Sequence, residues 1–127
     1  MFMVMLVLDR QDLLTRVLDA WQEAGIRGAT VLESTGMHRI QQCRVRLHAR
    51  FDFAHIADEC QERHNTLFAV VEDMALVEKC LSATEAVVGD LASPNTGIFA
   101  AWPVARVKGL PKNQAAGGGA SGDEVAP

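Results

Sequence analysis

The sequence predicts a small α+β domain of the split βαβ, ferredoxin-like plan, in which two helices cover one face of a four-stranded antiparallel sheet. Two observations lead to this prediction. Apolar runs typical of strands and stretches with helical periodicity follow one another as strand, helix, strand, a segment of mixed pattern, strand, helix, strand. The chain has 127 residues, 49% of them hydrophobic, which is enough for one domain with one core.

Four segments have the composition of strands. The first is a continuous apolar run that ends at Asp9, which is typical of a buried strand. The others contain β-branched or aromatic residues and are bounded by turn-forming residues. The four predicted strands are FMVMLVL (2–8), ATVLEST (29–35), TLFAVVED (66–73) and TGIFAAW (96–102), and VARVKG (104–109) is a candidate for a short fifth strand.

Two segments carry apolar side chains at the spacing of a helix. We expect Asp9 and Asp12 to support the start of the first helix, by capping and through the helix dipole. We expect Gly25 and Gly89 to end the two helices, because glycine readily adopts the conformation of a C-terminal cap. The predicted apolar faces are Leu13, Leu14, Val17, Leu18 and Trp21 within 12–23, and Met74, Leu76, Val77, Cys80, Leu81, Ala83 and Val87 within 73–90.

The remaining segments set the domain boundaries. Within 37–64, QQCRVRLHARF (41–51) alternates like a strand, whereas DFAHIADECQERH (52–64) has helical spacing, so both structures stay open there. From Pro111 onward the only large apolar residue is Val125, and such a composition cannot form a core. We therefore predict one domain over 1–110 and a disordered C-terminal tail over 111–127.

The composition of the chain limits the classes of function and the cellular locations that we expect. The net charge of −4 argues against a non-specific nucleic-acid binder, although CRVRLHAR (43–50) is locally basic. Three cysteines at irregular spacings suit reduced thiols in a cytosol better than a disulfide framework. The apolar run at the N-terminus has neither a preceding positive region nor a small-residue cleavage site, which argues against a signal peptide, and no segment approaches the length that spans a bilayer. We expect a cytoplasmic protein without a membrane span.

The predicted fold leaves one face of its sheet without helices. Apolar strand residues such as Leu6, Val31 and Val70 need cover on one face or the other. Oligomerisation is the simplest way to supply that cover, so we expect a homo-oligomer.

Three stretches resemble PII-type nitrogen regulatory proteins. AGIRGATVLESTG (24–36) is similar to the family signature in which the first helix leads into the second strand. FAVVEDMALVEKCLSATEAVVGD (68–90) has the spacing of the family's third strand and second helix, and NTGIFAAWPVARVKG (95–109) is similar to its terminal elements. The resemblance covers roughly 1–110 and excludes 37–64. It implies a homotrimer that binds adenine nucleotides between subunits and signals through a loop after the second strand.

The resemblance also implies a set of ligand contacts. Ile40 stands where the family has a glutamine that helps to bind a metal-chelated 2-oxoglutarate, although Gln41 and Gln42 follow, so the match does not carry that ligand over. Gly97 stands where the family's phosphate loop has a lysine, and the chain contains no tyrosine, unlike the family's long loop. The implied contacts are Thr30 near the adenine, Gly36 and Arg39 at the start of the loop, Asn95, Thr96 and Gly97 in the phosphate turn, and Arg106 and Lys108 on the basic segment that follows.

Each of these residues also has a purely structural explanation. Pro94 to Gly97 has ordinary β-turn chemistry, and it is a phosphate site only if cations replace the missing lysine. Arg106 and Lys108 alternate along a predicted strand and would share one face of it. There they either bind phosphate or, as charges on a solvated edge strand, prevent its pairing with another chain. Thr30 is a common β-branched strand residue.

A metal site is the alternative from another functional class. His55 with Glu59, and Cys60 with His64, are spaced i, i+4, but neither pair matches a known metal motif. No catalytic constellation stands out, so we expect a protein that is not an enzyme. The leading hypothesis is a PII-like regulator, a homotrimer that binds a small anionic effector, for example ATP, ADP or AMP, and modulates a protein partner through 37–50. The alternative is a trimeric scaffold or CutA-like divalent-metal module without nucleotide.

Overall fold

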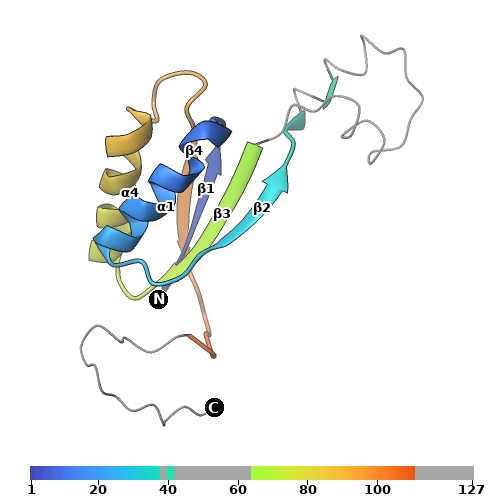
Figure 1. The fold of residues 1–127 in the computed structure, drawn as a ribbon. Coiled ribbons are helices and arrows are strands. Elements are labelled where there is room, and N and C mark those ends of the chain that lie inside the picture. The colour runs from blue at the N-terminus through green and yellow to red at the C-terminus, as the bar shows by residue number, and fades with distance from the viewer. Residues whose placement is uncertain (38–39, 42–63, 111–127) are drawn as a thin grey trace.

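The computed structural model of this chain describes residues 1–37, 40–41 and 64–110 (Figure 1). Each of the four predicted strands and two predicted helices is present within these residues. In chain order the elements are β1 (Phe2–Leu8), the 3-10 turn η1 (Gln11–Leu13), α1 (Leu14–Ala24), β2 (Thr30–Ser34), β3 (His64–Val71), α4 (Met74–Val88) and β4 (Gly97–Pro103).

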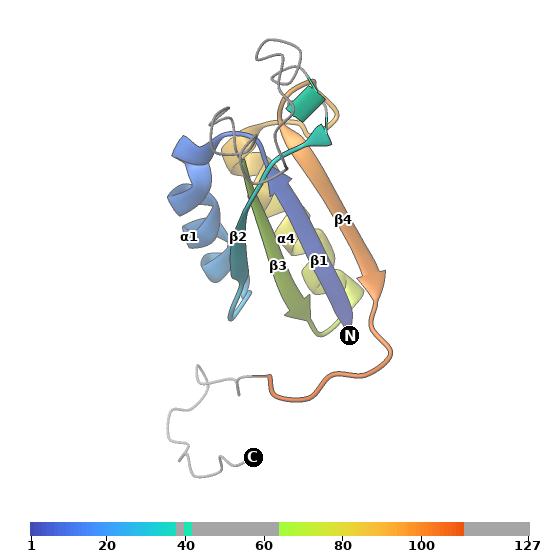
Figure 2. The ribbon, with the colours of Figure 1, turned by 90° about the vertical axis from the view of Figure 1, so that its right-hand side faces the viewer.

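The four strands form one antiparallel sheet in the order β2-β3-β1-β4. β1 pairs with β3 from Phe2 opposite Val71 to Leu8 opposite Asn65, and with β4 from Phe2 opposite Pro103 to Leu8 opposite Gly97. Both helices lie on the same face of this sheet (Figures 1 and 2). The structure is therefore a small α+β domain whose strand order is compatible with the predicted ferredoxin-like plan.

The core lies between the helices and the sheet. Alternate residues of β1 and β3 point toward the helices, because successive side chains of a strand face opposite ways. From α1, the predicted apolar face is confirmed, with Val17 and Trp21 buried and Leu14 and Leu18 packed beside them. The buried cluster consists of Val4, Leu6, Leu8, Val17, Trp21, Ile26, Leu67, Ala69, Val71, Val77 and Cys80.

The start of α1 differs from the prediction. The helix follows a 3-10 turn, and neither Arg10 nor Leu13 at the two N-cap positions makes a side-chain capping bond, so the predicted cap at Asp9 is wrong. Asp12 instead forms an exposed ion pair with Arg10 at 2.7 Å, and this hydrogen bond lowers the pKa of the Asp12 carboxyl. The predicted end is confirmed: Gly25 adopts a left-handed φ of 108°.

The polar residue Thr84 lies on the core side of α4, although the predicted apolar face of this helix did not include it. Asp73 caps this helix by accepting a hydrogen bond from the N–H of Leu76 at 2.9 Å, and Gly89 ends it. Met74, predicted for the apolar face, is half exposed in the first turn. Thr84 is fully buried because its hydroxyl accepts from the indole N–H of Trp21 at 2.8 Å and donates to the carbonyl of Cys80 at 2.7 Å.

The predicted fifth strand does not form. β4 ends at Pro103, which pairs with Phe2, the first residue of β1. Beyond this pair the carbonyl of Met1 accepts a hydrogen bond from the N–H of Val104 at 3.0 Å. Residues 104–109 pair with none of the described strands, and they leave the sheet. The basic segment 43–50 and the tail 111–127 lie outside the described residues.

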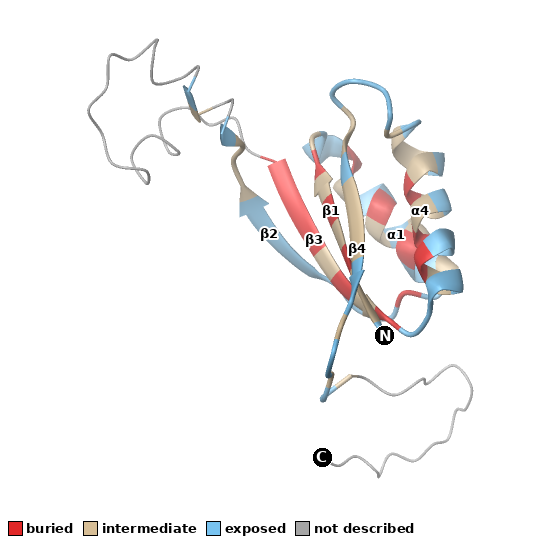
Figure 3. Ribbon diagram, turned by 180° about the vertical axis from the view of Figure 1, so that it is seen from behind, coloured by how far each residue is buried: buried red, intermediate tan, exposed pale blue. Residues whose placement is uncertain are grey.

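The sheet face without helices is apolar over β1 and β4 and mixed over β2 and β3. This open face consists of the strand residues that alternate with the core: Met3, Met5, Val7, Thr30, Leu32, Ser34, His64, Thr66, Phe68, Val70, Ile98, Ala100 and Trp102. It contains no Lys, Arg, Asp or Glu. Ile98 is 61% exposed, Leu32 52% and Trp102 42%. Figure 3 shows β2 exposed along most of its length beside the largely buried β3. Within the described residues, no helix has the length and apolarity needed to cross a bilayer.

The hydrogen bonds of Thr84 give a first prediction. Thr84→Val keeps the side-chain shape but leaves the buried indole N–H of Trp21 without its acceptor, and a buried unsatisfied donor costs about 1–3 kcal/mol. Urea unfolding should show this loss in the free energy of unfolding. Ser82→Ala, on the exposed side of α4, is the control and should change stability by less than about 0.5 kcal/mol. Equal stabilities of the two variants would contradict the role assigned to Thr84.

Candidate functional site

The length difference between β2 and β3 creates a hollow at the edge of the sheet. β2 begins at Thr30, opposite Phe68, whereas β3 continues to Val71. The described part of β2 therefore has no residue beside Ala69, Val70 and Val71, and the edge of β3 is bare there. The chain between Gly25 and Thr30 turns away from this edge, and the space that it leaves is the hollow.

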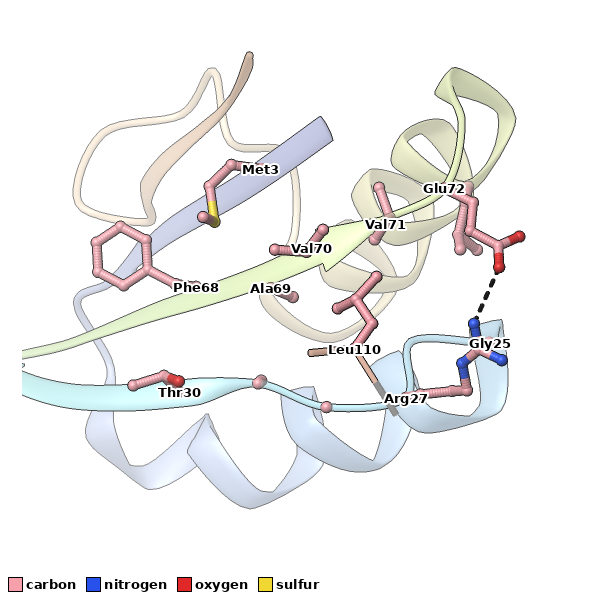
Figure 4. Close-up of a pocket in the computed structure, with 13 residues that line it drawn as sticks. Met3, Gly25, Arg27, Thr30, Phe68, Ala69, Val70, Val71, Glu72 and Leu110 are labelled. Atoms are coloured by element: carbon pink, nitrogen blue, oxygen red, sulfur yellow. Dashed lines mark hydrogen bonds and ion pairs between the residues drawn. The ribbon is translucent and has the colours of Figure 1, made fainter. Parts of the chain in front are cut away.

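This β3-edge hollow has a volume of about 320 Å³, near the lower limit for small-ligand sites. Its walls are mostly apolar, with Thr30 at one side and the ion pair between Arg27 and Glu72 at the other (Figure 4). The hollow is lined by Met3, Gly25, Arg27, Gly28, Ala29, Thr30, Phe68, Ala69, Val70, Val71, Glu72, Leu76 and Leu110.

The segment 25–29 separates this hollow from a second one. The second hollow, of about 560 Å³, lies toward α1 and adds Leu18, Trp21 and Gln22 to the same segment. The Nη2 of Arg27 lies 3.0 Å from the Oε2 of Glu72, which ties the segment to the end of β3. This ion pair is exposed, and such pairs contribute only about 0–1 kcal/mol. Ile26 anchors the start of the segment in the core, whereas 27–29 are exposed and held by little beyond this ion pair, with open space on both sides.

The predicted phosphate turn is a self-supporting turn in the structure. The hydroxyl of Thr96 shares its proton between the carbonyls of Ser93 at 2.8 Å and Leu91 at 3.3 Å. Asn95 has a φ of 63°, the only left-handed φ of a non-glycine residue in the described chain. Gly97 has a φ of 139°, and a Cβ there would collide with the carbonyl oxygen of Val7. These three residues have structural reasons to be present whether or not a ligand binds.

Gly36 lies at the same end of the sheet, beside a polar cluster on the open face. A Cβ on Gly36 would lie 3.4 Å from the Nε2 of His64. The Oγ of Ser34 lies 2.7 Å from the Nδ1 of His64 and 2.8 Å from the Oγ1 of Thr66. These contacts join the last residue of β2 to the first residues of β3. Arg39, the next predicted contact, lies outside the described residues.

Arg106 and Lys108 are exposed, but they do not lie on a strand. The expectation that strand alternation points both side chains the same way is therefore wrong. They belong to residues 104–110, which we call the C-terminal strap, and Leu110 at its end lines the β3-edge hollow. The strap thus brings two cations to the end of the molecule that holds Thr30.

The structure separates the predicted contacts into two groups. Thr30 and the strap lie at the end of the sheet that holds the hollow. Gly36 and residues 95–97 both lie at the other end of the sheet, where β2 ends and β4 begins. Gly97 and Pro103 are the two ends of β4, about 20 Å apart at the usual rise of a strand. One chain therefore does not bring all the predicted contacts to one point.

The described residues contain no group of three or more side chains suited to a metal ion. Of the four residues weighed as metal ligands, His64 is described, and it belongs to β3 rather than to a helix. Burial raises the pKa of the Cys80 thiol to about 12, despite an opposing hydrogen bond with Thr84. Cys80 is thus a core residue, as the sequence predicts, and a poor nucleophile.

Sequence reasoning missed most of the hollow. Arg27 and Glu72 lie 45 residues apart, and their pairing has no sequence signal. Leu110 is the last apolar residue before a tail of small and polar residues, and this change in composition is the one hint that it contacts the domain. No protein-family model and no curated protein matches the chain. Its possible functions are therefore argued from its residues and their geometry.

The conformation of Gly97 leads to a second prediction. Gly97→Ala places a Cβ against the backbone of β1 and forces a left-handed φ on a residue with a side chain, so it should destabilise by about 2 kcal/mol or more. Gly28→Ala is the matched control because its Cβ would meet nothing within 4 Å and its φ is not left-handed. Chemical denaturation measures both. If the two substitutions lower the free energy of unfolding equally, the conformation of the turn does not require a glycine at position 97.

Proposed function

We propose that the chain is a PII-like regulatory protein, a homotrimer that binds a small anionic effector between its subunits and modulates a protein partner. An adenine nucleotide, ATP, ADP or AMP, is the leading candidate for the effector. The observation that carries the proposal is the open face, a mostly apolar surface without Lys, Arg, Asp or Glu that has no helix of its own to cover it.

The open face supports self-association. Large apolar side chains such as Ile98, Leu32 and Trp102 are about half exposed on it. Fully burying one such side chain is worth roughly 1.5–3 kcal/mol, so covering several of them strongly favours a contact. Because Lys, Arg, Asp and Glu are absent from this face, a second copy would leave no unpaired charge of this surface in the interface.

The separation of the candidate contacts supports a site between subunits. A neighbouring copy packed on the open face can bring its Gly36 and 95–97 turn next to the hollow of the first copy. A ligand there would contact Thr30 and the strap from one subunit and the turn from the next. Such a site exists only in the oligomer, which couples ligand binding to the relative positions of the subunits.

The two ends of this site would do different chemistry. The hollow offers apolar walls from Phe68 and Val70, the hydroxyl of Thr30 and the bare backbone edge of β3, which suit a flat heterocyclic base. Arg27 already pairs with Glu72, so the cations left for phosphate groups are Arg106 and Lys108 on the strap. Charge-assisted bonds from these two residues would replace the lysine missing from the turn.

Signalling would depend on which conformation the segment after β2 adopts when the ligand binds. A ligand that binds one arrangement of this segment better than another shifts its population, and the partner reads that shift. The predicted recognition segment 37–50 falls largely outside the described residues. Gly36 and the Ser34–His64 contact form its described base.

Calorimetric titration tests the ligand. At least one of ATP, ADP and AMP should bind, and the double substitution of Arg106 and Lys108 by alanine should weaken binding at least tenfold, because each charge-assisted hydrogen bond is worth about 1.5–3 kcal/mol. The control is the double substitution of Arg16 and Lys79 by alanine, which removes the same charge from exposed positions on α1 and α4. Affinity that survives the first double substitution refutes the site.

The same titrations separate the two classes of function. No heat with any of the three nucleotides, together with tight binding of a divalent metal ion, would refute the nucleotide proposal in favour of a CutA-like metal module.

Analytical ultracentrifugation tests the oligomer. The unchanged protein should sediment as a trimer of the 13.8 kDa chain. Ile98→Lys places a charge on the open face, on the edge strand β4, and should yield monomers, because burying an unpaired charge is costly. Thr15→Lys adds the same charge on the exposed side of α1 and should remain trimeric. A monomer at micromolar concentrations of the unchanged protein would exclude the homotrimer.

A further inference from the structure

The C-terminal strap has one side against the domain and one side in solvent. Val104, Val107 and Leu110 are half-buried, whereas Ala105, Arg106, Lys108 and Gly109 are exposed. At its start, the N–H of Val104 is bonded to the carbonyl of Met1 at 3.0 Å. Every third residue is thus partly buried, although the strap belongs to neither a strand nor a helix.

A glycine turns the end of the strap toward the hollow. Gly109 has a left-handed φ of 98°, and a Cβ on it would meet nothing within 4 Å. Crowding does not require a glycine here, so the backbone conformation is the physical reason for it. The next residue, Leu110, lines the β3-edge hollow (Figure 4).

Leu110 lines the hollow between two of its walls. In Figure 4 its side chain stands between the end of β3 and the 25–30 segment, on the same hollow as Thr30, Met3 and Phe68. Apart from Arg27, Thr30 and Glu72, the side chains of the walls are apolar, so the leucine side chain and a flat apolar ring compete for the same kind of surface. The strap has few hydrogen bonds to the domain, and segments of this kind open at low free-energy cost.

We propose that the C-terminal strap is a built-in competitor for the β3-edge hollow. In the closed state Leu110 forms one wall of the hollow and narrows it. A ring that enters the hollow displaces Leu110 and frees the strap, whose Arg106 and Lys108 can then reach anionic groups attached to that ring. The apparent affinity for the ring is lowered by the fraction of closed protein, so any partner that holds the strap away would raise it. This regulation rests on the proposed function for the identity of the natural ligand.

Indole is a suitable probe because it is a flat apolar ring without phosphate. In the full-length protein, its binding is followed by the NMR shifts of the Thr30 and Phe68 amides. Leu110→Ser removes the competing side chain and should tighten indole binding about threefold or more. Leu110→Phe enlarges that side chain and should weaken it. Ala105→Ser, an exposed strap position that receives the same new residue, should bind like the unchanged protein.

Two results would overturn the proposal. If Leu110→Ser, Leu110→Phe and Ala105→Ser all bind indole with equal affinity, Leu110 does not compete for the hollow. An absence of shifts at Thr30 and Phe68 in every variant means that the hollow does not accept a ring. A parallel titration with ATP separates this inference from the proposed function. If indole binding follows the expected order and ATP gives no heat, the nucleotide proposal fails and the competition by the strap stands.

Discussion

The pairing of β1 with a neighbour on each side is the constraint on which the rest of this structure depends. All seven residues of β1 lie opposite residues of β3 and of β4. Its alternation therefore decides which side chains enter the core, with Val4, Leu6 and Leu8 under the helices, and Met3 and Met5 on the open face. A slip of one residue would exchange the two faces, so the register is set by the burial that it makes possible.

The same strand sets the limits of the functional surfaces. Because β1 begins at Phe2, β4 has no partner beyond Pro103, and the chain leaves the sheet as the strap. Because β2 begins at Thr30 while β3 runs on to Val71, the edge of β3 is bare and the hollow forms there. The strap and the hollow are thus consequences of where pairing stops.

Charge is distributed differently from what the turn between α4 and β4 led us to expect. The hydroxyl of Thr96 is bonded within its own turn, and Gly97 is needed for the close approach to β1. The described cations of the implied contact set, Arg106 and Lys108, lie on the strap instead, whose last residue Leu110 lines the hollow. Under the proposed function, the strap and not the turn at 95–97 would bind the negative charge of the ligand. Because the strap can change its position, the affinity for the ligand could be regulated.

Local pattern accounts for most of what could be predicted. Strand and helix positions, the glycine caps at Gly25 and Gly89, and the burial of Trp21 and Cys80 all follow from periodicity and backbone preference within a few residues. The start of α1 departed from prediction because Asp12 pairs with Arg10 and a 3-10 turn comes before the helix.

By itself the sequence thus determined the elements, the side of each helix that is buried, and the presence of an apolar sheet face, because these depend on the local order of side chains. Only the tertiary structure decided that Thr84 enters the core beside Trp21, that Arg27 pairs with Glu72, that 104–109 is not a strand, and that Leu110 reaches the hollow beside Thr30. Each of these depends on which residues from distant parts of the chain lie side by side, and on where one strand ends relative to its neighbour.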